Sequence, residues 1–154
     1  SVQDLLDAGA QVGTKGNATG YTPLVWASGF GDYNSIPLLL EAGSNIEATD
    51  GIDGSTPLMH ASKTGKIEGM QILIDRRADV NARNLKGETP LLACASHANG
   101  TVDKVELLVA SGADLSAKDN GGRSALDLAK QRTDGNSSAV LAFLSERMPA
   151  EGAE

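Results

Sequence analysis

Short apolar segments rich in Leu and Ala alternate along the chain with polar segments rich in Gly, Asn and Asp. One apolar segment reads "TPLVWA" from Thr22 and returns as "TPLMHA" from Thr56, "TPLLAC" from Thr89 and "SALDLA" from Ser124. The starting points are 34, 33 and 35 residues apart. Recurrence at such a period is typical of repeat architectures, in which each unit is one supersecondary structure.

Within each unit the pattern predicts two short helices. Thr can cap a helix start, and Pro fits the first helical position, where its missing N–H costs nothing. In the third full unit Val105, Leu108 and Val109 are spaced as one face of a second helix. The glycines expected to end first helices are Gly31, Gly65 and Gly100, and those expected to end second helices are Gly9, Gly43 and Gly112. A helix pair this short cannot cover its own apolar face, so each unit needs a like neighbour.

The repeat resembles the ankyrin repeat, which has a period of about 33 residues and the signature T-P-L-H-x-A. The resemblance spans roughly residues 1–148 and implies an all-α solenoid, an L-shaped stack of antiparallel helix pairs with β-turn fingers along one side. We therefore predict a single domain over residues 1–154. Its predicted parts are a truncated repeat and finger at 1–19, repeats at 20–53, 54–86 and 87–121, the last with a two-residue insertion, a C-terminal capping repeat at 122–149, and a tail at 150–154.

Departures from the signature predict local consequences. The signature His is absent from all four units, so we expect its polar contacts, and some stability, to be missing. The residues in its place are Val25, Met59, Leu92 and Asp127. Arg77 stands where other units end the second helix with Gly, so it either adopts left-handed backbone at a cost of about 1 kcal/mol or ends the helix differently. Pro37 cannot donate a backbone hydrogen bond inside a helix, so we expect its helix to begin late, capped near Asn34 or Ser35.

Charge and composition restrict the possible partners. The formal net charge of −7 argues against nucleic acid as the main partner, because contacts with phosphates need a surplus of Lys and Arg. The single cysteine, Cys94, can form no internal disulfide, which favours a reducing, intracellular and cytoplasmic setting. The longest apolar runs, such as Ile36 to Leu40, are too short to span a bilayer. We expect a monomer without membrane insertion.

No combination of residues predicts catalysis, a cofactor or a metal site. Cys94 and His97 are three residues apart and could meet on a helix as thiol and imidazole, but Cys94 takes the place of a small packing Ala in the other units. Two His and one Cys do not make a closed zinc site, which needs four ligands. Trp26 and His60 share one repeat position, where we expect packing between neighbouring units. We therefore expect no enzymatic activity.

The exposed surface offers the candidates for function. The resemblance implies a concave surface where finger tips and the exposed side of each first helix hold a protein or peptide. The candidates are Tyr21, Phe30, Ile52, Asp53, Lys63, Leu85, Lys86, Glu88, His97, Asn120 and Arg123. The large apolar side chains among them stand out, because exposed turns gain nothing from such side chains unless something covers them. Alternatively, Ile52 and Leu85 fold back on their own fingers.

One modification site is also predicted. The segment "LIDRRADVNA" resembles the motif of the asparagine hydroxylase that acts on ankyrin repeats, with Leu73 eight residues before Asn81. The other units carry no Asn at this position, so Asn81 is the candidate. In ankyrin repeats this Asn more often braces the turn through hydrogen bonds with the backbone.

Three hypotheses for function follow from the sequence. The first is a non-catalytic protein-protein interaction module. The second is a regulatory or targeting domain of a larger enzyme or channel, packing against its own chain, which the truncated first unit favours. The third is an engineered repeat binder, but its units would be nearly identical, and the insertions, Pro37 and Arg77 argue for a natural sequence.

Overall fold

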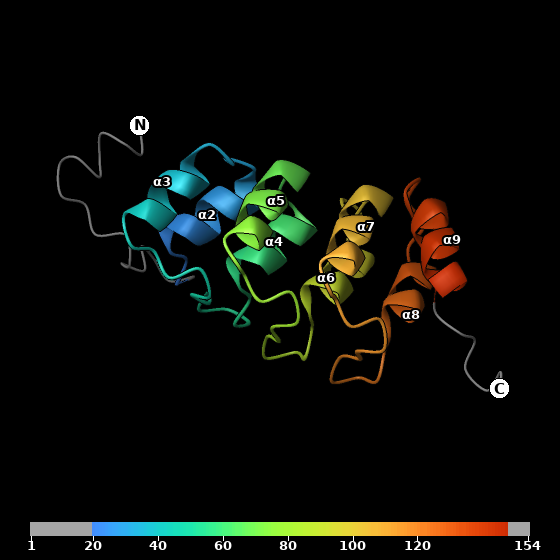
Figure 1. Cartoon of the computed structure of the whole chain (residues 1–154). Coiled ribbons are helices and arrows are strands. Elements are labelled where there is room, and N and C mark those ends of the chain that lie inside the picture. Colours follow the sequence, from blue (N-terminus) through green and yellow to red (C-terminus); the bar gives the residue numbers. More distant parts are fainter. Residues whose placement is uncertain (1–19, 148–154) are drawn as a thin grey trace.

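The helices form two parallel rows, and polar turns project along one side (Figure 1). The structure, a computed structural model, describes residues 20–147. The row nearer the turns, here the inner row, contains α2 (Pro23–Phe30), α4 (Pro57–Lys63), α6 (Pro90–Ser96) and α8 (Ala125–Lys130). The outer row contains α3 (Ser35–Glu41), α5 (Ile67–Asp75), α7 (Val102–Ala110) and α9 (Ser137–Arg147).

Each inner helix packs against the outer helix that follows it, and each pair stacks on the next pair. This arrangement confirms the all-α solenoid predicted from the repeat. Inner helices contact one another more extensively than outer helices do. The predicted half-repeat at 1–19 and the tail at 150–154 lie outside the described residues.

The inner helices begin as the Thr-Pro pattern predicts. Thr22, Thr56 and Thr89 are N-caps whose side chains accept a hydrogen bond from the backbone N–H three residues on, at 3.3 to 3.4 Å. Ser124 caps α8 in the same way, and the Asp127 carboxylate accepts a hydrogen bond from the backbone N–H of Ser124. Such caps each contribute about 1 kcal/mol to stability.

At the signature His position, one unit carries a polar side chain, whose hydrogen bonds stay within its own repeat. Asp127 completes a capping box with Ser124, so this position keeps a polar role in the last repeat. In the other three units the position is apolar and fully buried, and it forms part of the core between neighbouring repeats. The three side chains are Val25, Met59 and Leu92.

The ends of the outer helices require left-handed backbone. Gly43 and Gly112 have φ of 100° and 99° just after α3 and α7. Arg77 takes the same place after α5 with φ of 68°, so the helix ends in the usual way and Arg77 bears the conformational cost. The first of the two alternatives for Arg77 is therefore confirmed.

Two of the inner helices, α4 and α6, end differently from the prediction. Gly31 is left-handed, with φ of 77°, and ends α2 as expected. Gly65 and Gly100 are not left-handed, and α4 and α6 end before them, at Lys63 and Ser96. These glycines are needed for close approach instead, because a Cβ at either would overlap a backbone carbonyl oxygen of an inner helix.

The prediction for Pro37 is confirmed. Helix α3 begins at Ser35 with Asn34 as its N-cap, so Pro37 lies in the first turn, where it breaks no hydrogen bond. Val140, Phe143 and Leu144 of α9 are buried against the preceding repeat and close the described end of the core. Segment 97–101, which carries the extra residues of its repeat, connects α6 to α7, and segment 131–136 connects α8 to α9.

Candidate functional site

Three projecting turns, at residues 50–55, 84–88 and 119–123, are called fingers here. Each finger is held by one side chain at its start, namely Asp50, Asn84 or Asp119. The Oδ1 atom of each accepts hydrogen bonds from two or three backbone N–H groups of its own finger, at 2.9 to 3.0 Å. This pattern fixes the backbone of the fingers and therefore the direction of their side chains.

Neighbouring fingers are joined through their backbones. The N–H of Leu85 donates to the carbonyl of Asp53 at 2.8 Å, and the N–H of Asn120 donates to the carbonyl of Lys86 at 2.9 Å. The Asn120 side chain also donates to the carbonyl of Leu85. Asn120, predicted as a partner-binding residue, thus braces two fingers. The fingers form one continuous edge along the inner row.

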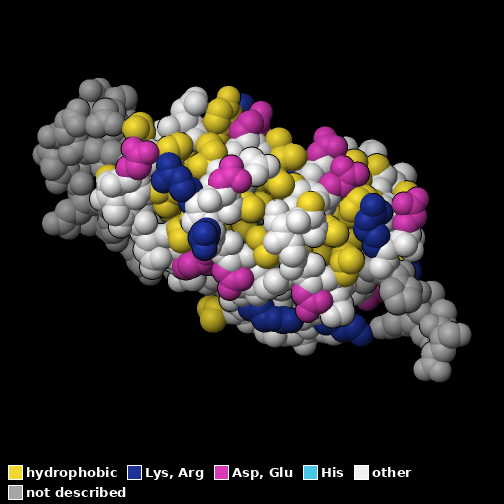
Figure 2. All heavy atoms as spheres, viewed as in Figure 1, with side chains coloured by type: hydrophobic (Ala, Val, Ile, Leu, Met, Phe, Trp, Pro, Cys, Tyr) yellow, Lys and Arg dark blue, Asp and Glu magenta, His cyan; other side chains and the backbone are white. Residues whose placement is uncertain are grey.

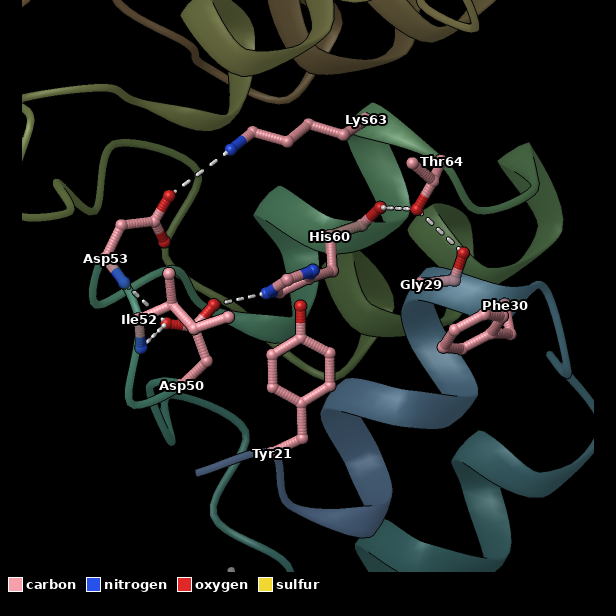
Figure 3. Close-up of a pocket in the computed structure, with 9 residues that line it drawn as sticks. All are labelled: Tyr21, Gly29, Phe30, Asp50, Ile52, Asp53, His60, Lys63 and Thr64. Carbon is pink, nitrogen blue, oxygen red and sulfur yellow. Dashed lines mark hydrogen bonds and ion pairs between the residues drawn. The ribbon is translucent and has the colours of Figure 1, made fainter. Parts of the chain in front are cut away.

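A groove opens between α2, α4 and the first finger, with a volume of about 500 Å³ (Figure 3). Five predicted site residues line it together, namely Tyr21, Phe30, Ile52, Asp53 and Lys63. The other lining residues are Gly29, Asp50, His60 and Thr64. His60, expected in packing between units, lines the groove, and Asp50 is not among the residues predicted from sequence. The regular recurrence of Asp50, Asn84 and Asp119 in the fingers is the signal that could have found it.

One wall of the groove is aromatic. Trp26 stacks on Phe30 with ring centroids 4.4 Å apart, and Tyr21 contacts Trp26 edge-on at 5.7 Å. Trp26 is 43% exposed and Phe30 is 70% exposed. Trp26 is therefore partly exposed beside Phe30 and is not part of the buried core. The wall offers aromatic faces directly to solvent.

The floor of the groove carries a buried acid. Oδ2 of Asp50 lies 2.7 Å from Nε2 of His60, which ties the first finger to α4. Burial alone would raise the pKa of Asp50, but hydrogen bonds from His60 and from the backbone of the finger hold the pKa below its ordinary value. Burial raises the pKa of the Tyr21 phenol, and the negative charges of Asp50 and Asp53 raise it further.

Alternating charges continue along the finger edge. Nζ of Lys63 lies 3.8 Å from Asp53 and 3.5 Å from Glu88, and Nζ of Lys86 lies 3.3 Å from Asp53. These four predicted residues therefore form one network next to the groove. Lys86 is its most exposed member. In Figure 2 several Lys and Arg side chains lie along the lower edge, where the turns of Figure 1 project.

The remaining predicted residues lie farther along the stack. Leu85 is 77% exposed and Ile52 is 60% exposed, and the Leu85 side chain lies beside Gly54 of the preceding finger. Arg123 is paired with Asp119 of its own finger at 2.7 Å. His97 follows α6 and accepts a hydrogen bond from the backbone of Asn99. Burial and then the nearby Lys63 lower the pKa of His97.

Cys94 lies in the buried core, and Asn81 is hydrogen-bonded to the backbone of the next repeat. Cys94 is buried, and burial raises its pKa to about 12, so the thiol stays protonated. The Asn81 side chain accepts from the backbone N–H of Asp114 at 2.8 Å and donates to the carbonyl of Gly112 at 3.1 Å. The hydroxylation of Asn81 stays a prediction.

Among residues 20–147, no group of three or more His, Cys, Asp or Glu side chains is placed to hold a metal ion.

The stacked helix pairs with braced fingers define a repeat solenoid, and comparison with known families identifies the class. A family model of three ankyrin repeats matches residues 1–84, and a model of one ankyrin repeat matches residues 86–120. The first match alone covers more than half of the chain, so the protein belongs to the ankyrin repeat family. A search of curated proteins found no match to the chain. No helix within residues 20–147 has the length and apolar character to cross a membrane.

Proposed function

We propose that the protein is a non-catalytic interaction module that holds a protein or peptide partner on its finger and groove surface. Ankyrin repeats are generally protein-protein interaction modules. The observation that supports this surface is the exposure of Phe30, Ile52 and Leu85 on one side of the stack. Large apolar side chains that remain exposed on a folded surface often mark a binding site.

The rigidity of the scaffold favours binding. The finger backbones are fixed by Asp50 and Asn84 before any partner arrives, so little conformational entropy is lost when the apolar side chains are covered. The charged network beside the groove supplies a polar rim around these side chains. Such a rim selects partners of complementary charge, and it contributes more to this specificity than to the affinity.

The setting of this function is also proposed. The net charge of −7 supports a protein partner in preference to nucleic acid. The protonated, buried Cys94 is compatible with a reducing compartment, and we propose that the protein acts as a monomer in the cytoplasm.

The test is capture of partners from cell lysate by the wild-type chain and by a variant with Phe30, Ile52 and Leu85 changed to Ala. We expect the variant to lose specific partners and to keep its fold, because these side chains are largely exposed and their truncation costs little stability. Circular dichroism and thermal unfolding verify the fold. The matched control changes three exposed outer-row residues, Glu68, Gln71 and Glu106, to Ala.

Three outcomes are distinguishable. Loss of a partner with the groove variant alone supports the proposal. Loss with the outer-row variant alone places the partner on the opposite face and contradicts it. Retention of all partners by both variants contradicts the groove as the binding surface as well.

A further inference from the structure

The groove contains a glycine that packing does not require. Gly29 lies in the last turn of α2, where Ala would stabilise the helix. A Cβ at Gly29 would meet Cβ of His60 at 3.5 Å, Oγ1 of Thr64 at 3.6 Å and Nδ1 of His60 at 3.7 Å, all ordinary van der Waals distances. Its backbone is not left-handed. The missing side chain therefore leaves open the space between α2 and the His60 ring.

The ring that faces this space presents a hydrogen-bond acceptor. Asp50 is held in its ionised form and can only accept, so the Nε2 atom of His60 carries the proton of their hydrogen bond. In the neutral imidazole the Nδ1 atom is then an acceptor. It lies on the side of Gly29, and no hydrogen bond from residues 20–147 reaches it (Figure 3).

Around this acceptor the groove combines aromatic faces with negative charge. Phe30 and Tyr21 line it on the α2 side, and aromatic faces attract cations. Asp50 and Asp53 lie on the finger side. Lys63 is the one Lys or Arg side chain that lines the groove among the described residues, and its Nζ is directed toward Asp53, away from Phe30 (Figure 3).

We propose that this groove binds an arginine side chain of an extended segment of the partner, with the guanidinium against Phe30 and donating to Nδ1 of His60. This inference rests on the proposed function and names the chemistry of the partner. Arginine fits better than lysine because its planar group stacks on aromatic rings and carries five donors. An apolar side chain would leave the acceptor without a donor, and an acidic one would be repelled by Asp50 and Asp53.

The test uses four capped pentapeptides of alanine with arginine, lysine, norleucine or glutamate at the centre. Each is titrated into the isotope-labelled chain and followed by NMR at the Gly29 amide and the His60 imidazole nitrogens. The chain has only two histidines, so the imidazole signals are readily assigned. We expect saturable shifts with the arginine peptide, including a shift of Nδ1, and binding about tenfold weaker with norleucine.

Two variants distinguish specific binding at this site from non-specific binding of the peptide. Gly29→Ala fills the space beside Nδ1, so we expect the arginine peptide to bind at least about fivefold more weakly, while the melting temperature stays the same or rises by about 2 °C. Gly135→Ala is the matched control, because a Cβ there meets only open space and Gly135 lies outside the groove. We expect it to leave binding unchanged.

The outcomes distinguish this inference from the proposed function. Norleucine or glutamate peptides that bind the same residues as tightly as the arginine peptide would overturn the inference and leave the groove as a binding site. Unchanged binding by Gly29→Ala would also overturn it. If none of the four peptides shifts the groove signals, the inference is wrong, and capture by the Phe30, Ile52 and Leu85 variant still decides the proposed function separately.

Discussion

A single carboxylate connects the fold of this protein to its candidate site. One oxygen of Asp50 holds the backbone of the first finger, and the other binds His60 on α4. The equivalent residues of the next fingers, Asn84 and Asp119, brace their own turns but use their second polar atom differently, toward Glu88 and Arg123. The position of His60 in the groove therefore depends on a contact that neither of the next two fingers makes.

We predict that Asp50→Asn lowers the free energy of unfolding at pH 7 by about 1 to 2 kcal/mol. Asparagine can still accept from the finger backbone, as Asn84 does, but its neutral amide replaces the charged acceptor of His60. The pKa of Asp50 is lower in the folded chain than its ordinary value of 3.8, so the carboxylate stabilises the fold above that pH, and this stabilisation is lost as the pH falls through the folded pKa.

The wild-type chain should therefore lose stability toward pH 3 more steeply than the Asp50→Asn variant, since the variant lacks this titrating group. Urea unfolding of both chains at several pH values between about 3 and 7 measures the difference. Glu106→Gln, on the exposed face of α7, is a control expected to follow the wild type. Parallel curves for the wild type and Asp50→Asn would contradict the prediction.

At the scale of elements, helix starts were predictable from sequence and several helix ends were not. A start depends on neighbouring residues, so Thr56 followed by Pro predicts it directly. Glycine at a helix end can serve left-handed backbone or close packing, and sequence alone does not separate the two. Gly65 and Gly100 were misassigned for this reason, because the atoms that exclude a Cβ there belong to inner helices packed against them.

The candidate site likewise contains features that sequence could predict and features that it could not. Exposure of Phe30, Ile52 and Leu85 was predictable, because repeat register assigns positions to fingers and helix faces. The contact between Asp50 and His60 was not, because it joins a finger to a helix through packing that no local pattern encodes. What repeats in the sequence was therefore predictable, and what is particular to one repeat required the structure.

We predict that Arg77→Gly raises the free energy of unfolding by about 0.5 to 1 kcal/mol. Left-handed backbone costs a non-glycine residue about 1 to 2 kcal/mol, and the greater freedom of glycine in the unfolded chain offsets part of the gain. Gly43→Ala should show the reverse effect, because φ there is 100° and the added Cβ meets only open space. Urea unfolding of both variants gives the two signs, and a stabilised Gly43→Ala chain would contradict the account.

Across the whole molecule, the repeats are joined by side chains that reach backbone carbonyls of the repeat before. Thr64, Lys104 and Arg132 each donate to such a carbonyl, at 2.8, 2.7 and 2.9 Å. Lys104 also donates to the carbonyl of Asn99, and Arg132 also donates to the carbonyl of Ala98, both in segment 97–101, which carries the extra residues of its repeat. These bonds hold the stack together where helix ends would otherwise leave buried carbonyls without donors.

Lys104 provides the sharpest test of these hydrogen bonds between repeats. Its ammonium is buried and joins two repeats through the carbonyls of Gly65 and Asn99. We predict that Lys104→Met lowers the free energy of unfolding by about 2 kcal/mol, since methionine fills similar space but leaves both carbonyls without a donor. The penalty of burying a charge offsets part of the loss. Hydrogen exchange should also become faster in segment 97–101.

Lys130→Met, at an exposed position of α8, is the matched control and should change neither quantity appreciably. If Lys104→Met proved as stable as the wild type, the helix stacking alone would hold these repeats together, and the buried lysine would have no structural role.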